Sequence, residues 1–164
     1  MTEPVADRPD MPEGYLGHPP LPWSWAEQQL LTARNYWVTT IGPKSRPHVR
    51  PVWGVWLDDS LLFSTGARHG THISRDPRVT VNLEDADECL ILEGTAEAVA
   101  DETVRRAFAD AHETKYDWPL TLDFLRLVYV VHPSVAFGWL AYDIAPEATL
   151  FQSTATRWRF TASP

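Results

Sequence analysis

A short segment in the middle of the chain carries residues suited to binding an anion. Ser64, Thr65 and Gly66 end an apolar run, and Arg68 follows shortly after. Hydroxyl groups, free backbone N–H groups at a helix start and a fixed positive charge are groups that hold a phosphate. An ordinary turn followed by a helix cap has the same residue types, so both interpretations stay open.

Two histidines follow at a spacing that places them on one helix face. His69 and His72 stand three residues apart, as a pair of metal ligands would. A third ligand is missing nearby, so surface or anion-contacting histidines are the favoured interpretation and no metal is expected. The sequence contains no Gly-x-Ser-x-Gly, Walker, Gly-x-Gly-x-x-Gly or His-Glu-x-x-His motif. No residue is an obvious catalytic acid, base or nucleophile.

The preceding segment supplies a second set of candidates. Pro51 cannot donate a hydrogen bond to a strand ladder, so it marks an edge or a bulge where backbone groups stay free for a ligand. Trp53 and Trp56 point to opposite faces of a strand. We therefore expect one of them in the core and the other along a groove.

Charge is distributed unevenly along the chain. The chain has 14 Lys and Arg residues and 22 Asp and Glu residues, and the net charge of -8 argues against a nucleic-acid partner. The segment 44–78 is nevertheless basic, because its bases outnumber Asp58, Asp59 and Asp76; they are Lys44, Arg46, Arg50, Arg68, Arg75 and Arg78. A basic segment in an acidic chain fits a small anion, and a solvated basic face is the alternative.

Length and composition predict one domain in a reducing compartment. A chain of 164 residues with 44% apolar side chains fits a single core. Cys89 is the only cysteine, and no apolar run reaches the ~18 residues of a membrane span. We expect a cytoplasmic protein without a membrane partner. Six prolines in residues 1–22 predict an irregular arm, and 23–164 form the domain.

Strand signals dominate the rest of the chain. A capping box at Ser24 to Glu27 opens a helix that ends near Arg34, a short helix covers 71–74, and Asp101 caps another helix. Strands are predicted at 35–41, 48–57, 61–65, 78–84, 88–99, 127–132, 135–142 and 156–160. Asp58-Asp59-Ser60 form a turn between the second and the third of them. Two of them meet at a Pro133-Ser134 corner. Short turns between such strands favour a mainly β fold, a closed antiparallel barrel with a few helices.

At these residues the chain resembles the pyridoxamine 5'-phosphate oxidase-like, flavin-binding split barrels, in particular the actinobacterial branch that uses the deazaflavin coenzyme F-420. The matching segments follow the family's order over nearly the whole chain after the arm. They are Pro22-Trp23-Ser24-Trp25, Arg34-Asn35-Tyr36-Trp37, Arg46-Pro47-His48, Pro51-Val52-Trp53-Gly54-Val55-Trp56, Asp76-Pro77-Arg78-Val79, Glu93-Gly94 and Thr156-Arg157-Trp158-Arg159-Phe160.

The resemblance implies a six-stranded antiparallel split barrel that forms a homodimer, with cofactor sites built at the interface from both subunits. In that pattern the strand from Arg50 to Trp53 lies along the flavin ring, and the segment after Ser64 holds the phosphate. Arg68 falls on the family's Arg, whereas His69 stands where Lys is usual and His72 replaces a common Asn. The implied cofactor-binding residues are Arg50, Pro51, Val52, Trp53, Ser64, Thr65, Gly66, Arg68, His69, His72, Trp158 and Arg159.

The implied function is that of an oxidoreductase. It would bind F-420, or FMN as the second choice, and pass a hydride to an unsaturated small molecule such as an enone or a quinone; the cofactor would carry the chemistry. The alternatives are a non-catalytic flavin or haem-binding protein, with His69 or His72 as axial ligand, and a scaffold with an empty site. A neutral His69, with a pKa near ~6.5, would hold a phosphate more weakly than Lys, and a bound phosphate should raise that pKa.

Overall fold

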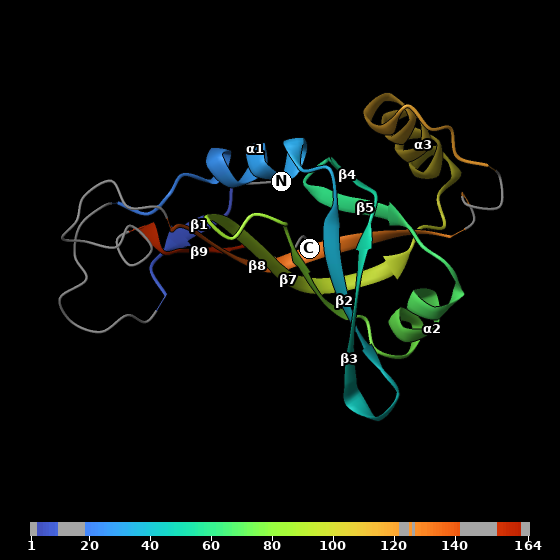
Figure 1. Cartoon of the computed structure of the whole chain (residues 1–164), viewed down its shortest axis with the longest axis horizontal. Helices are drawn as coiled ribbons and strands as arrows, with labels where there is room; N and C mark the ends of the chain where they lie inside the picture. Colours follow the sequence, from blue (N-terminus) through green and yellow to red (C-terminus); the bar gives the residue numbers. More distant parts are fainter. Residues whose placement is uncertain (1–2, 10–18, 122–124, 126, 142–153, 162–164) are drawn as a thin grey trace.

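The computed structural model describes residues 3–9, 19–121, 125, 127–141 and 154–161 of the chain. Antiparallel strands dominate these residues (Figure 1). No helix in this part of the chain is both long enough and apolar enough to span a membrane.

Six strands close into a ring. Strand β3 runs through Trp53 directly into β4, so the two act as one bent strand. Around the ring, β2 pairs with β3, β4 with β5, β5 with β8, β8 with β7, β7 with β6, and β6 with β2. This confirms the predicted six-stranded antiparallel split barrel. The strands are β2 (Tyr36–Gly42), β3 (Arg46–Val52), β4 (Gly54–Leu57), β5 (Ser60–Ser64), β6 (Arg78–Asn82), β7 (Glu88–Ala98) and β8 (Val128–Leu140).

Strand β8 corrects one prediction. The expected strands 127–132 and 135–142 are one strand, and Pro133-Ser134 is not a corner between them. The pairing shifts instead, because Glu93 lies opposite Val135 and Gly94 opposite Pro133, which leaves Ser134 as the extra residue of a β-bulge. A Cβ on Gly94 would collide with the backbone of His132, so the bulge needs glycine there.

The N-terminal arm is also more regular than expected. Strand β1 (Val5–Asp7) pairs with β9 (Thr156–Arg159), which in turn pairs with the second half of β8. The Asp7 carboxylate accepts hydrogen bonds from Arg157 Nε at 2.7 Å and Nη2 at 2.9 Å, and these bonds lower the pKa of Asp7. The irregular arm predicted for residues 1–22 is therefore wrong for residues 5–7. Residues 10–18 lie outside the described part.

The described residues form three α-helices around the barrel. The first, α1 (Trp23–Thr32), starts without the predicted capping box, because the Pro22 carbonyl accepts the Trp25 N–H at 3.0 Å and no side chain caps the turn. The second, α2 (Ala67–Arg75), is longer than predicted and lies beside the β2–β3 hairpin, away from α1 (Figure 1). The third, α3 (Glu102–Tyr116), has the predicted cap, since Asp101 accepts the Thr103 N–H at 2.7 Å.

The main core fills the barrel. Its fully buried members include Tyr36, Val38, Leu61, Phe63 and Leu92, and Trp23, Ala26 and Leu30 of α1 pack against them. A smaller cluster lies under α3 and contains Val55, Leu62, Phe108 and Val128. Residues 58–59, both with positive φ, form the predicted tight turn between β4 and β5. Pro43–Ser45 form a 3-10 turn between β2 and β3.

Candidate functional site

A cavity of about 460 Å³ lies where β3 faces the start of α2. Seven of the twelve predicted cofactor-binding residues line it. The full lining is His48, Arg50, Pro51, Val52, Thr65, Gly66, Arg68 and His69. The fold therefore brings together the two sequence segments that were predicted to hold a flavin ring and its phosphate.

The N-terminus of α2 is open toward a ligand. Gly66 precedes the helix in an extended conformation, and no side chain caps the first turn. A Cβ placed on Gly66 would meet no atom within 4 Å, so the space beside it is open. Uncapped N–H groups and the positive end of the helix dipole favour an anion at this place.

His69 is the most unusual side chain in the cavity. It is only 3% exposed, and neither Nδ1 nor Nε2 has a hydrogen-bond partner among the described residues. Buried polar groups without partners are rare in folded proteins, because each forfeits its hydrogen bonds to water. Since the imidazole lines the cavity, a ligand there would supply the missing partner.

Burial also sets the charge of His69. Loss of water around the imidazole lowers its pKa to about 4, and the neighbouring His48, His72 and Arg50 add to this effect. His69 is therefore neutral at pH 7. Its expected pKa near ~6.5 in the free protein is wrong, because the sequence does not reveal that the ring is buried.

His72 has a different environment. It is buried as well, but its Nδ1 lies 3.0 Å from Thr40 Oγ1 on β2. Of the two expected alternatives, the surface position is therefore wrong for both histidines, and the contact with an anion stays a prediction. The His48 ring lies 5.1 Å from the His69 ring and 5.2 Å from the His72 ring. In the described part of the chain, no group of three or more His, Cys, Asp or Glu side chains could hold a metal ion.

A second cavity of about 480 Å³ adjoins the first, since His48 and Arg68 line both. Its other lining residues are Gly42, Pro43, Lys44, Arg46, Pro47 and His72. Lys44, Arg46, Arg50 and Arg68 form no ion pair with a carboxylate of the described residues. Their positive charges are thus available to an anionic ligand.

The remaining predicted residues lie outside the first cavity. Ser64 ends β5 without lining it, and His72 lines only the second cavity. Trp53 is exposed and Trp56 is buried, as expected for side chains on opposite faces. Trp158 is fully buried beside Trp23 and Trp25, and its Nε1 donates to Leu21 O at 3.2 Å. The prediction that Trp158 contacts a cofactor is not supported, because its ring has no free surface.

Arg159 lies on β9, at the other end of the sheet from α2 (Figure 1). It is exposed and donates to Asp7 Oδ2 at 3.3 Å. Sequence reasoning did not single out His48, although the Arg46-Pro47-His48 segment was part of the resemblance. From the sequence, Lys44 and Arg46 were considered only for their charge. Their proximity to His72 depends on how the β2–β3 hairpin packs against α2, which is a tertiary feature.

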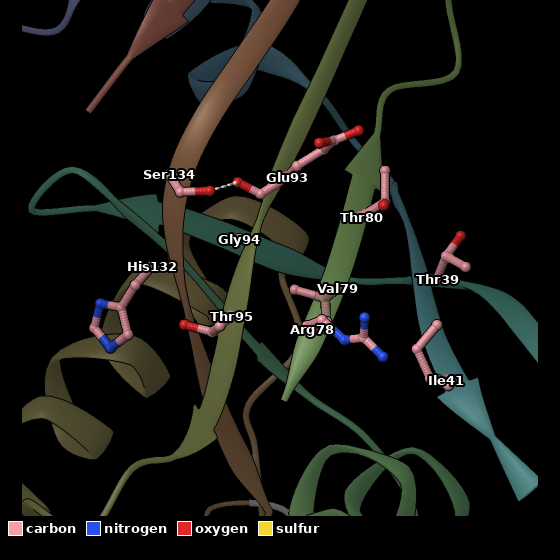
Figure 2. Close-up of a pocket in the computed structure, with 10 residues that line it drawn as sticks. All are labelled: Thr39, Ile41, Arg78, Val79, Thr80, Glu93, Gly94, Thr95, His132 and Ser134. Atoms are coloured by element: carbon pink, nitrogen blue, oxygen red, sulfur yellow. Dashed lines mark hydrogen bonds between the residues drawn. The ribbon is translucent and has the colours of Figure 1, made fainter. Parts of the chain in front are cut away.

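Another cavity, of about 450 Å³, opens on the outer face of β2, β6, β7 and β8 (Figure 2). Threonine hydroxyls line it, and at the bulge Ser134 Oγ donates to the Glu93 carbonyl at 3.0 Å. The Arg78 guanidinium in this cavity is already paired with Asp76, through bonds of 2.9 and 2.6 Å. No predicted site residue lines this cavity, and it suits an anion less well than the two basic cavities.

Comparisons with known proteins agree with the fold. The family model described as pyridoxamine 5'-phosphate oxidase matches residues 26–162. A conserved hypothetical protein of Mycobacterium tuberculosis aligns with a TM-score of 0.65 and 20% identity over 79% of this chain and 89% of its own. An F420 reductase aligns with a TM-score of 0.55 and 26% identity over 77% and 98%.

A heme-binding protein of Mycobacterium smegmatis aligns with a TM-score of 0.57 and 18% identity, over 84% of this chain and 61% of its own. No curated protein matches the chain.

Proposed function

Because the chain belongs to the pyridoxamine 5'-phosphate oxidase family, we propose that it is an oxidoreductase that binds a flavin-type cofactor in the cavity between β3 and α2. The observation that carries this proposal is the buried, unpartnered His69 beside an uncapped helix N-terminus. A phosphate at this place would accept hydrogen bonds from the α2 backbone and from the neutral imidazole. Arg68 and Arg50 would neutralise its charge.

The residues of the cavity fit such a cofactor in two further respects. Pro51 and Val52 offer an apolar edge of β3 for a ring, and the threonine hydroxyl of Thr65 lies beside the phosphate position. When bound, a reduced deazaflavin or flavin supplies a hydride, and the unsaturated small-molecule substrate takes up a proton as well. The protein's part is to bind and orient both molecules.

We prefer F-420 to FMN because of the second cavity. Its Lys44 and Arg46 would meet anionic groups beyond the phosphate. The part of F-420 beyond its phosphate carries ionised carboxylates, whereas FMN ends at its phosphate. The 26% identity to an F420 reductase supports the same choice.

Haem is the second candidate ligand. A neutral imidazole with both nitrogens free is a chemically suitable axial ligand, and a heme-binding protein shares the fold. A haem would occupy His69 through a nitrogen–iron bond, whereas a flavin-type cofactor would use it as a hydrogen-bond donor. The two ligands differ in their absorption spectra.

We also propose that the functional unit is a homodimer with its sites at the subunit interface. Arg159 is separated from α2 within one subunit, so it would join the cofactor only from the partner. Two of the tryptophans, Trp53 and Trp118, are exposed and could pack against a partner subunit. Light scattering should give twice the chain mass of 18.6 kDa, and a clean monomer would contradict the shared site.

The deciding experiment is a titration of the full chain with F-420, FMN and haemin, followed by fluorescence and absorption. We expect saturable binding of F-420 that is weakened by Lys44→Ala and Arg46→Ala, whereas the same variants should leave FMN binding unchanged. Arg75→Ala, at the exposed C-terminal end of α2, serves as the charge control. Failure of both F-420 and FMN to bind would overturn the proposal, and a Soret band lost in His69→Ala would favour haem.

A further inference from the structure

Trp53 presents an exposed aromatic surface, and it directly follows Pro51 and Val52, which line the cavity. Its ring stacks on Tyr116 of α3, with ring centres 4.8 Å apart and planes at 4°, yet the residue remains 39% exposed. The Arg34 guanidinium lies 5.8 Å from the Trp53 ring centre and 5.9 Å from that of Tyr116. A point almost equidistant from two parallel rings lies at the edge of the stack. Arg34 therefore does not cover the indole face that is turned away from Tyr116.

The backbone around Trp53 is held firmly in place. The Tyr116 hydroxyl accepts the Gly54 N–H at 3.0 Å and lies 2.7 Å from the Gly54 carbonyl and 2.8 Å from the Arg34 carbonyl. Lys115 Nζ donates to Tyr36 Oη at 2.9 Å and to the Gly54 carbonyl at 3.2 Å. A Cβ on Gly54 would come within 2.9 Å of Leu61 Cδ1, so the close packing there requires glycine.

Arg34 brings a free charge to this surface. Within the described residues its guanidinium has no carboxylate partner, and its own carbonyl is within hydrogen-bond distance of Tyr116. A planar π face beside an unpaired guanidinium matches a flat, conjugated molecule that carries an anionic group. The ring would stack on the indole, and the guanidinium would pair with a carboxylate or sulfonate.

We propose that Trp53 and Arg34 form the substrate-binding surface, and that the substrate class is a planar conjugated molecule with a carboxylate or sulfonate at its edge. This inference rests on the proposed function. Pro51 and Val52, which line the cofactor cavity, immediately precede Trp53 in the chain. A molecule on the indole would thus lie next to the cofactor, as hydride transfer requires.

Three matched probes test the two parts of this surface by calorimetry. They are 2-naphthoate, its uncharged analogue 2-naphthamide, and decahydro-2-naphthoate, which keeps the charge but is not planar. We expect 2-naphthoate to bind about fivefold more tightly than 2-naphthamide, the value of one exposed ion pair at its upper range. We expect it also to bind about fivefold more tightly than decahydro-2-naphthoate, which is within the range of one aromatic stacking contact. Equal binding of all three probes by the wild type would overturn the proposal.

Variants assign the two contributions. Arg34→Gln should remove the preference for 2-naphthoate over 2-naphthamide. Trp53→Leu should remove the preference for 2-naphthoate over decahydro-2-naphthoate, and Trp53→Tyr should partly restore that preference. Trp118→Leu and Arg75→Gln, an exposed tryptophan and an exposed arginine outside the stack, should change neither preference. A preference that survives both Arg34→Gln and Trp53→Leu would overturn the proposal.

The same variants separate this inference from the proposed function. Arg34→Gln should leave F-420 affinity within about twofold of the wild type, because Arg34 does not line the cofactor cavity. If no cofactor binds but naphthoate discrimination persists, the proposed function fails and the surface stands. If F-420 binds but the probes are not discriminated, the surface fails and the cofactor site stands.

Discussion

His72 Nδ1 lies 3.0 Å from Thr40 Oγ1, and this contact ties α2 to the barrel strand β2. His69, one turn earlier on the same helix, has no partner at either ring nitrogen within the described part of the chain. Two histidines that look equivalent in the sequence thus have different environments. His72 ties the helix to the barrel, and His69 would bind the proposed ligand.

The Thr40–His72 contact should contribute to stability. Thr40→Val would remove the hydroxyl and leave a buried imidazole nitrogen unpaired, so we expect the free energy of unfolding to fall by about 1–3 kcal/mol. Urea denaturation measures this change. Thr39→Val, on the same strand but with its side chain on the outer cavity, is the control and should change stability much less. Equal effects of the two substitutions would mean that the contact is not stabilising.

Burial of His69 should make stability depend on pH. Its pKa is about 4 in the folded protein and near 6.5 when unfolded, so between these values the unfolded state binds more protons. Unfolding free energy should therefore fall by about 2 kcal/mol as the pH drops from about 7 to about 5. His69→Gln should lose this part of the pH dependence. If the unfolding free energy of the variant changes with pH as in the wild type, other groups such as His48 cause the dependence.

Arg68 should act on the ligand and not on the fold. Its side chain is exposed and lines both basic cavities. Arg68→Ala should weaken cofactor binding by about 1.5–3 kcal/mol, the range for a hydrogen bond to a charged group, and leave the Tm of the free protein nearly unchanged. Cofactor titration and a thermal melt check the two parts. Equal affinities would place the phosphate elsewhere.

His69→Lys should strengthen binding of FMN at about pH 8, because a cation would replace a neutral imidazole beside the phosphate. A bound phosphate raises the His69 pKa above the value of about 4 in the free protein, so wild-type affinity should approach that of the variant as the pH falls toward about 4. The phosphate's own second pKa, near ~6, acts on both proteins equally and cancels in the comparison. Identical affinities and pH profiles would show that His69 does not contact the phosphate.

Lys115 should produce a second pH effect at alkaline pH. Burial lowers its pKa to about 8, below the unfolded value of 10.5, so between these values the unfolded state binds more protons. Stability should rise between about pH 7.5 and about pH 9, and Lys115→Met should abolish the rise. The window ends near pH 9, where the Cys89 thiol, whose pKa burial raises to about 11, acts in the opposite direction, and the raised pKa values of Tyr36 and Tyr116 add to this at higher pH. Denaturation at two pH values measures the effect.

Much of the barrel could be predicted because its hairpins are local in sequence. Alternating apolar residues located β6 and β7, the pair Asp58-Asp59 located a tight turn, and Asp101 located the start of α3. The β8 strand was missed as one unit for a physical reason. From Tyr129 to Pro133 its buried positions are odd-numbered, and from Ala136 to Gly138 they are even-numbered, so the bulge reverses the alternation that identifies a strand.

The site was predictable in its residue types but not in its environments. Arg50, Thr65 and Arg68 could be placed together because the motif order relates them. The burial of His69 depends on how α2 packs against β2 and β3, which no local pattern encodes. Likewise, Trp158 looked available because its terminal motif resembles a site, whereas the packing of Trp23 and Trp25 from α1 covers it.

Strand β8 has a consequence for the order of folding. The hairpins β2–β3, β4–β5 and β6–β7 join near neighbours in the sequence, but β8 alone pairs with β5, β7 and β9. A growing polypeptide that has not yet reached residue 128 has its hairpins but leaves the hydrogen-bonding groups of β5 and β7 unpaired. Closure of the ring then depends on contacts between distant residues, which slows folding and leaves those edges open to aggregation until the last third of the chain is made.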